Sequence, residues 1–526
     1  MEMLFTLLFA VICTQIGIAL LHFRFKNAAT KRLRNIVSSI ALLEFLLACW
    51  LLSWYAINGQ SATTWTFIEW SHGGGISFFY DGATSLMLLL VSFIGFVVCR
   101  FSIRYLDGEE SEARYFRFLG FTIGSVSLLV VAGNLLLLFA AWVMTSFGLH
   151  QLLLHYPHRR AAQRAAWTKF AISRIGDVFL IAALVLVFRS FKTFDLASLF
   201  SSAETIVLTS SSGPMHTAIA LLLVLGAVTK SAQFPFHTWL PETLETPTPV
   251  SALMHAGIVN AGGYLIIRLS PIVSLAPVAL TILALFGAFT ACFAAVVMMT
   301  QPSIKRVLAY STIAQMGFMM LQCGLGAFSA AMLHILAHSL YKAHAFLSSG
   351  SVIDQANKRL RSVPTTHSMQ RTTVSFIFAA VISVLSLLAI ATVGGLHIEA
   401  KPGGVILAMI LCLALTTWGW RMSSNGGRPA SGIAITGVVG MCIAYFGFYL
   451  AVDAWLQPLA VSASYTNSSL LVLTLSALGF GLLFGLHVVV YQFSTPTWIN
   501  SLRVHASNGF YIESVYRRVF APLKNT

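Results

Sequence analysis

His334, His338 and Lys342 recur at every fourth position of one apolar stretch, and His344 follows two residues later. On an α-helix this spacing places the first three side chains along one stripe, which drifts by about 40° at each step. Histidine changes charge near neutral pH, and the environment of a buried lysine brings it into a similar range. The stripe is therefore a candidate path along which protons pass between side chains.

Two other interpretations of the stripe stay open. Histidines four residues apart can bind zinc, but no acidic or cysteine ligand lies close in the sequence to complete a tetrahedral site. We therefore predict no metal site in this chain. The histidines can also simply hydrogen-bond to neighbouring helices within a bundle.

Lys230 ends another apolar stretch and is followed by Ser-Ala-Gln-Phe-Pro, so a proline interrupts any helix that continues past it. A break at membrane depth frees backbone groups that lipid cannot satisfy, and such breaks mark ion sites in transporters. Burial disfavours the charged form of a lysine and a nearby carboxylate favours it, so Lys230 is predicted to load and unload a proton. The alternative is a lysine whose long side chain reaches the membrane surface.

Four further residues join these candidates. Arg174 and Asp177 stand three apart, which predicts a supporting ion pair on one helix face. His255, near the start of its apolar stretch, either receives protons from Lys230 or caps its helix. Glu44, alone in its stretch, is either a neutral acid or the partner of a basic group elsewhere.

The composition around these side chains is that of a membrane protein. Of 526 residues, 57% are hydrophobic and 9% are charged, whereas a soluble domain carries about a quarter charged residues. Because a spanning helix needs about 20 mostly apolar residues, the sequence predicts an all-α membrane protein with about 15 transmembrane helices. The predicted spans are 3–21, 36–57, 83–101, 116–132, 134–154, 167–188, 215–236, 250–269, 277–299, 304–323, 329–350, 374–395, 404–422, 432–452 and 470–493.

Basic residues gather on alternate connections between the predicted spans. With the N-terminus outside, 25 of the 32 lysines and arginines fall on the inner connections and the C-terminus, Lys169 among them. Four fall on the outer side: Arg189, Lys192, Arg268 and Lys401. The positive-inside rule then predicts a multi-pass protein of a bacterial inner membrane with a periplasmic N-terminus and a cytoplasmic C-terminus. The net charge of +15 thus reflects topology in the lipid bilayer and predicts no nucleic-acid partner.

Several function classes have no supporting residues. The seven cysteines lie in or beside apolar stretches without a CxxC pair, so no iron–sulfur cluster or c-type haem is expected. No glycine-rich nucleotide loop follows a strand-like stretch. The sequence therefore predicts a transporter subunit rather than an enzyme, with no cofactor and no redox or hydrolytic site in this chain.

The chain reads as one transmembrane domain, 1–493, followed by a cytoplasmic C-terminal tail, 494–526. A hairpin outside the membrane is predicted at Ala56–Gly82, and a second, weaker helix break at Gly394-Gly395. The tail mixes aromatic and basic residues, as in Tyr516-Arg517-Arg518, and either lies along the membrane surface or binds a partner.

Four segments in register resemble the proton-translocating membrane subunits of respiratory complex I and the Mrp-type cation antiporters. The likeness is closest over 165–350, in Lys169–Asp177, Lys230–His255, Lys305–Thr312 and His334–Gly350. The resemblance implies two inverted five-helix repeats, an antiporter-like core at about 116–422, and broken seventh and twelfth helices. It also places candidate residues on the family's proton path, namely Lys230, His255, His334, His338 and Lys342.

The sequence departs from the family along this path. The family has a glutamate just after a tryptophan in the fifth span, which pairs with the lysine of the seventh, but here Val143 follows Trp142. The predicted twelfth span, 374–395, contains no charged residue, and the long lateral helix of the complex I relatives is missing. His150 is a candidate to replace part of the polarity lost in the fifth span.

These departures, and the segment Phe236–Pro247, resemble most closely the membrane subunits of inorganic-carbon pumps within this family. That resemblance implies a cytoplasmic partner that contains zinc and is similar to β-carbonic anhydrases, in which cation entry drives hydration of CO2 to bicarbonate. Two alternatives stay open. The first is an ion-translocating subunit of an NADH dehydrogenase- or hydrogenase-type complex or of an Mrp-type antiporter, and the second is a membrane scaffold without ion flux.

Overall fold

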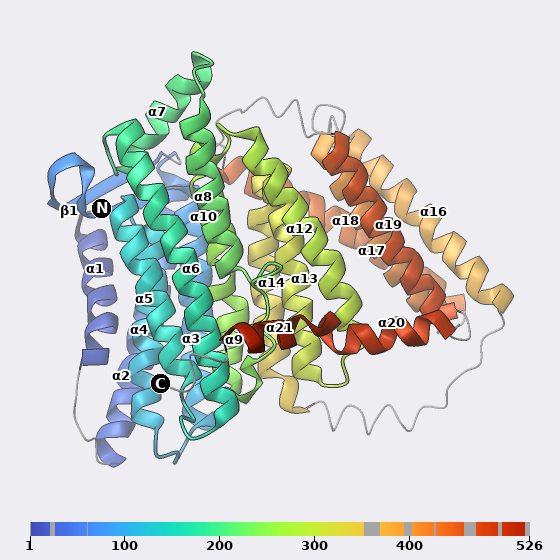
Figure 1. Ribbon diagram of the computed structural model, residues 1–526, viewed down its shortest axis with the longest axis horizontal. Helices are drawn as coiled ribbons and strands as arrows, with labels where there is room; N and C mark the ends of the chain where they lie inside the picture. The colour runs from blue at the N-terminus through green and yellow to red at the C-terminus, as the bar shows by residue number, and fades with distance from the viewer. Residues whose placement is uncertain are drawn as a thin grey trace.

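Long apolar stretches form helices along nearly the whole chain (Figure 1). The computed structural model describes residues 2–20, 27–59, 61–351, 369–393, 402–424, 428–456, 470–492 and 497–520. Up to Lys230 the helices are α1 (Glu2–Gly17), α2 (Asn27–Ile57), α3 (Gly82–Tyr105), α4 (Glu112–Val131), α5 (Leu135–Leu153), α6 (Arg160–Phe191), α7 (Leu196–Leu208) and α8 (Pro214–Lys230). The following helices are α9 (Thr248–Ala256), α10 (Ala261–Arg268), α11 (Ser270–Val273), α12 (Pro277–Met298), α13 (Ile304–Gly324), α14 (Phe328–Leu347), α16 (Met369–Val393), α17 (Pro402–Ser424), α18 (Arg428–Leu456), α19 (Leu470–Gln492), α20 (Thr497–Ser507) and α21 (Ile512–Phe520).

Twelve helices of the described residues are long and apolar enough to cross a membrane, in line with the predicted all-α membrane fold. Every predicted span contains a helix, but α8, α13 and α14 stand outside those twelve. α8 has only 17 residues, while α13 and α14 are longer and carry basic side chains. The count of about fifteen crossings and the inverted repeats stay predictions, and the expected break at Gly394-Gly395 lies outside the described residues.

The interruption beside Lys230 comes earlier than the predicted span 215–236 implies. α8 ends at Lys230, and residues 231–247 continue as turns with one short 3-10 helix. Ala232 has a left-handed backbone with φ of +49°, which costs a residue with a Cβ atom about 1–2 kcal/mol. The freed Phe234 N–H donates to Thr290 Oγ1 on α12 at 3.1 Å, so a side chain replaces the lost helical partner.

A hairpin closes one end of the bundle, as predicted for Ala56–Gly82. The strands β1 (Thr63–Glu69) and β2 (Gly75–Tyr80) pair antiparallel, with Trp65 opposite Phe78. Phe78 is fully buried and its backbone also pairs with that of Ala132, at the end of α4. These contacts seat β2 on the helices, and we call this the hairpin end.

Arg268 corrects the prediction that places it in an outer connection. It is 1% exposed at the end of α10, and its guanidinium donates to both Asp81 carboxylate oxygens, at 2.7 and 3.0 Å. It also donates to Thr84 and Tyr264. Asp81 in turn caps α3, because its carboxylate accepts the Thr84 N–H at 2.9 Å. One buried, bidentate ion pair therefore joins α10, α3 and the hairpin end.

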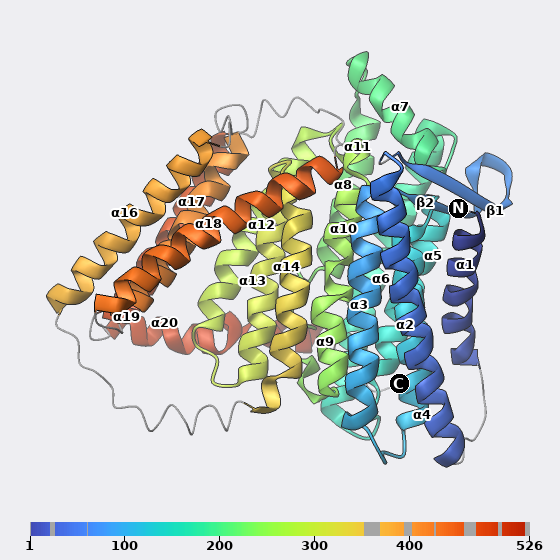
Figure 2. The ribbon, with the colours of Figure 1, turned by 180° about the vertical axis from the view of Figure 1, so that it is seen from behind.

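Helices α16 to α19 lie to one side of the other helices (Figures 1 and 2). In Figure 2, α18 runs diagonally past α12–α14 toward α3. Trp455, near its end, donates through Nε1 to Ser85 Oγ at 2.9 Å and packs against the ring of Tyr55. Asp453 accepts from Ser329 Oγ of α14 at 2.6 Å. α18 thus braces the C-terminal helices against α3 and α14.

The helices α20 and α21 form a strap, residues 497–520, that packs across α12 and α13 away from the hairpin end (Figure 1). The rings of Phe510 and Phe293 lie 5.7 Å apart between centroids. Arg306, near the start of α13, donates to Glu513 of α21 at 3.2 Å. The described part of the predicted tail therefore lies against the helix bundle.

We expect the Arg306–Glu513 pair to hold the strap on α13. Glu513→Arg should reduce the protection of α21 against hydrogen exchange, because two arginines then face each other. Adding Arg306→Glu should restore protection, with a coupling of about 0.2–1 kcal/mol for this partly exposed pair. Arg518→Glu, an exposed change on the same helix, is the control. Unchanged protection in the Glu513→Arg variant would show that the pair does not fix the strap.

Candidate functional site

Lys230 lies at the end of α8 with only 6% of its surface exposed. Its Nζ atom donates to Ser146 Oγ at 2.9 Å and to the Trp142 carbonyl at 3.2 Å, both on α5. The same nitrogen is 4.4 Å from the centroid of the Trp142 ring, within the range of a cation–π contact. Lys230 is therefore held in the interior by polar groups, and the alternative of a surface-reaching side chain is wrong.

Lys169 on α6 is a second buried lysine beside the first. The charge pattern places it among the inner connections, but it is 3% exposed and its Nζ atom donates to the Ser146 carbonyl at 2.7 Å. Ser146 thus accepts from two lysines, through its hydroxyl from Lys230 and through its carbonyl from Lys169. Two ammonium groups this close repel each other, so the arrangement favours fewer than two charges unless a carboxylate compensates.

Asp177 supplies that carboxylate. It pairs with Arg174 at 2.7 Å, which confirms the predicted ion pair, and it also interacts electrostatically with both lysines. Gly176 lets the helices approach, because a Cβ atom there would lie 2.2 Å from Thr229 Oγ1 on α8. Asp177 of α6 is thus a carboxylate that interacts with Lys230, where the sequence has no acid after Trp142 of α5. We call Lys230, Lys169, Ser146, Arg174 and Asp177 the Lys230 cluster.

A second set of polar residues, the His255 cluster, joins α9, α13 and α14. Lys342 Nζ and Thr312 Oγ1 both donate to the Leu308 carbonyl, at 3.2 and 3.0 Å. Because the Thr312 hydroxyl donates there, its oxygen accepts from His255 Nδ1, 3.0 Å away, which makes Nδ1 the protonated nitrogen. His338 Nε2 donates to the His255 carbonyl at 3.3 Å.

Of the predicted stripe on α14, His334 lies outside this cluster. The ring centroids of His334 and His338 lie 5.9 Å apart, and His334 Nε2 is buried without a hydrogen-bond partner among the described residues. His255 lies in the last turn of α9, so the alternative that it caps the start of a helix is wrong. The structure brings His255, His338 and Lys342 together and leaves His334 one step along the same helix.

Two contacts connect the clusters. Ser231, which follows Lys230, donates through Oγ to the Val259 carbonyl at 2.7 Å. Asn260 donates through Nδ2 to Ser339 Oγ, next to His338, at 2.8 Å. Residues 258–260 form a short 3-10 helix between α9 and α10, an interruption that the sequence reasoning does not predict. A second broken helix thus lies between the two sets of titratable residues.

Within the described residues, the side chains of the three auxiliary candidates make no hydrogen bond to either cluster. His150 hydrogen-bonds through Nδ1 to the Ala166 carbonyl at 3.1 Å and interacts electrostatically with Lys169 and Arg174. His344 is exposed, because two residues turn an α-helix by about 200° and so point it away from the stripe. Glu44 lies among α1, α2 and α4 and accepts from Gln15 Nε2 at 2.7 Å, and no ion pair of the described residues supports the alternative in which it pairs with a basic group.

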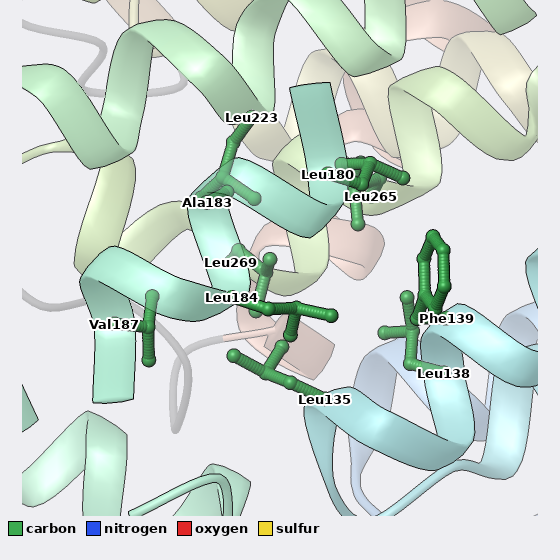
Figure 3. Close-up of a pocket in the computed structure, with 10 residues that line it drawn as sticks. All are labelled: Leu135, Leu138, Phe139, Leu180, Ala183, Leu184, Val187, Leu223, Leu265 and Leu269. Atoms are coloured by element: carbon green, nitrogen blue, oxygen red, sulfur yellow. The ribbon is translucent and has the colours of Figure 1, made fainter. Parts of the chain in front are cut away.

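An apolar pocket bounds the Lys230 cluster toward the hairpin end (Figure 3). It lies between α5, α6, α8 and α10, and Figure 3 shows leucine side chains such as Leu180, Leu223 and Leu265 pointing into it. None of its ten lining residues carries a polar side chain. The walls of this pocket are therefore apolar, whereas the polar contact next to Lys230 on the chain is that of Ser231 with the Val259 carbonyl.

Sequence reasoning misses three members of the site, namely Ser146, Thr312 and Asn260. It places Lys169 in the sixth span beside Arg174 and Asp177 and also counts it with an inner connection, but gives it no role. Lys169 and Thr312 both lie inside the family-like segments, and their positions there are a usable signal. Ser146 follows Trp142 by four residues and so shares its helix face. Asn260 is a single amide in a Gly-rich apolar stretch, which carries no comparable signal.

The chain matches family profiles over most of this region. The profile described as NADH:quinone oxidoreductase/Mrp antiporter, TM, matches residues 132–419. A second, described as the N-terminus of complex I chain 5, matches residues 72–116. Both clusters fall within the first match.

Two curated bacterial proteins are similar over most of their length. The probable inorganic carbon transporter subunit DabB2 of Halothiobacillus neapolitanus is 38% identical, with 84% of this chain and 79% of that protein covered. The probable inorganic carbon transporter subunit DabB of Hydrogenovibrio crunogenus is 33% identical, with coverages of 92% and 89%. Among solved structures, the Mrp complex from Dietzia sp. DQ12-45-1b matches with a TM-score of 0.57 and 23% identity, over 98% of this chain and 57% of that one. This last likeness concerns the fold.

Proposed function

Because the chain belongs to the NADH:quinone oxidoreductase/Mrp antiporter family of membrane subunits, we propose that it conducts protons to energise the uptake of inorganic carbon, CO2 or bicarbonate. One observation carries the proposal: two clusters of buried lysines and histidines meet at two broken helices inside a membrane protein. Ionisable groups at such depth are costly and mark ion pathways by default. The relatives' names favour inorganic carbon as the process that the ion flux drives.

We assign the steps of conduction to residues by their contacts. Lys230 is the loading site, where burial and Arg174 disfavour the ammonium form and Asp177 favours it. His255, His338 and Lys342 are the next carriers, and His334 lies at the far end of the stripe. A shift of Asp177 between Lys230 and its partner Arg174 would change the proton affinity of Lys230 and so gate the transfer.

The partner in this proposal is a DabA-like subunit on the cytoplasmic side, containing zinc and similar to β-carbonic anhydrases. Cation entry through this chain would drive one-way hydration of CO2 in that partner. Two observations support this partner. The relatives are named as subunits, and the charge pattern favours a cytoplasmic C-terminus in a bacterial inner membrane. The chain itself is proposed to hold no cofactor and to catalyse no reaction.

The second candidate function is ion translocation in an NADH dehydrogenase- or hydrogenase-type complex or in an Mrp-type antiporter. The family profile and the fold match to an Mrp complex favour it. Absence of a carbon phenotype in the experiment below, together with retained ion flux, would favour this candidate.

To test the proposal, the chain and its genomic neighbour should be expressed together in cells that lack carbonic anhydrase. We expect bicarbonate accumulation that requires both proteins and falls to background when the proton gradient is collapsed. Collapse of the sodium gradient alone should leave accumulation unchanged. Accumulation that survives loss of both gradients would refute ion-driven uptake, and dependence on sodium alone would refute the proton as the ion.

A further inference from the structure

Glu44 lies in the interior of the N-terminal helices, outside both clusters, with 0% of its surface exposed. One carboxylate oxygen accepts from Gln15 Nε2 of α1 at 2.7 Å. Ser127 of α4 lies within interaction range of the carboxyl, and the Cys99 thiol of α3 is the other titratable group that faces it. The carboxyl is thus enclosed by α1, α2, α3 and α4.

Among the described residues, no cationic side chain pairs with this acid. None of their ion pairs includes Glu44, and Arg34, one of the basic residues on the same helix, pairs with Asp107 and Glu112 instead. A buried carboxylate without a counter-charge is far less favourable than the neutral acid. Its surroundings therefore select the uncharged form.

The hydrogen bonds around Glu44 lack one donor hydrogen. Three buried oxygen atoms, Gln15 Oε1, Glu44 Oε1 and Ser127 Oγ, have no well-aligned hydrogen bond among the described residues, although Ser127 lies close enough to the carboxyl to interact with it. An ionised carboxylate can only accept, so among these three oxygens only the Ser127 hydroxyl carries a hydrogen to donate. One added proton supplies a second donor, because Glu44 can then donate to Ser127 and leave the Ser127 hydrogen free for another acceptor.

The packing of α4 holds Gln15 in place. A Cβ atom at Gly124 would lie 2.9 Å from Gln15 Oε1, so only glycine leaves room for this amide against α4. The carbonyl of Gln15 faces Gly120 one turn earlier, at 3.7 Å from the position of a Cβ atom. The site is therefore built by residues of three helices, α1, α2 and α4, and does not depend on Glu44 alone.

We propose that Glu44 is a resident proton-binding site: a neutral carboxylic acid that accepts from Gln15 and donates to Ser127. These two hydrogen bonds join α1, α2 and α4 without placing a charge in the membrane. The proton stays on Glu44 and takes no part in conduction through the two clusters. The proposal stands independently of the proposed function.

Infrared spectroscopy of the purified full chain tests this directly, because a protonated carboxyl has a C=O stretching band well separated from carboxylate bands. The difference spectrum between wild type and Glu44→Gln should show loss of one protonated-carboxyl band at neutral pH. Glu109→Gln is the matched control, since Glu109 is half-exposed and pairs with His155, and it should remove only carboxylate bands. Loss of carboxylate bands in Glu44→Gln, with the protonated band intact, would overturn the proposal.

A second variant keeps the test usable if Glu44→Gln does not fold. Ser127→Ala should shift the protonated band without removing it, because the acid keeps its proton and loses one hydrogen-bond partner. An unshifted band would contradict the hydrogen bond from Glu44 to Ser127. Spectra recorded with and without sodium ions should be identical, and a protonated band that appears only after sodium is removed would identify a cation site instead.

Discussion

Replacing Lys230 with alanine should reduce cation-driven uptake by about 10²-fold, with the protein still folded and inserted. The ammonium of Lys230 donates to Ser146 and Trp142 of α5 and interacts with Asp177 of α6, so it is the titratable group on which three helices converge. Without it, no side chain remains at the end of α8 to accept a proton and release it. The measurement is ion-dependent bicarbonate accumulation, normalised to the amount of inserted protein.

Two controls separate proton exchange from packing and from charge. Lys230→Arg keeps a positive charge that does not deprotonate in proteins, so it should lose uptake nearly as fully as alanine. Lys31→Ala removes an exposed lysine near the start of α2 and should leave uptake unchanged. Full uptake in the arginine variant would mean that Lys230 acts only as a fixed charge.

Asp177→Asn tests the partner of Lys230 in the same assay. If Asp177 fills the role of the acid missing after Trp142, its amide variant should lose most of the uptake as well, because the ammonium form of Lys230 then lacks its compensating charge. A mutant with normal uptake would assign Asp177 to the structural pair with Arg174 alone.

The sequence predicts patterns within one helix well, and it predicts contacts between helices poorly. Apolar runs and the 334–342 spacing depend on neighbours along one helix, and both appear in the structure as expected. The contacts that define the site cross between helices, such as that of Lys169 with Ser146 over 23 residues. Spacing along the chain cannot reveal which face of α6 meets α5, so Lys169 is assigned to a connection.

Asp177 and Arg268 are two further residues whose contacts with other helices the sequence does not predict. The i,i+3 spacing predicts the local pair of Asp177 with Arg174, but not its interaction with Lys230 on α8. Arg268 ends an apolar run, which is equally typical of a loop residue, and its partner Asp81 lies 187 residues away. Only the three-dimensional fold distinguishes a buried pair from a topology signal.

Breaking the Arg268–Asp81 pair should cost the fold more than any other single change considered above. Both side chains are 1% exposed, so Arg268→Ala leaves an uncompensated carboxylate and should lower the free energy of unfolding by about 3–5 kcal/mol. Asp81→Ala should cost about 1 kcal/mol more, because it also removes the cap of α3 at the Thr84 N–H. Unfolding in mild detergent, followed by tryptophan fluorescence, measures both.

A variant with both charges removed tests whether the loss of stability comes from an unpaired buried charge. Arg268→Met combined with Asp81→Asn removes both charges and keeps an acceptor for the Thr84 N–H, so it should be more stable than either alanine variant. The recovery arises because no buried charge is left unpaired. If the double variant is no more stable than the alanine variants, the unpaired charge is not the cause of their losses and the pair does not tie α10 to the hairpin end. If it is more stable, the alanine variants should also expose α18 to hydrogen exchange at Trp455, whose indole donates to Ser85 on the capped helix α3.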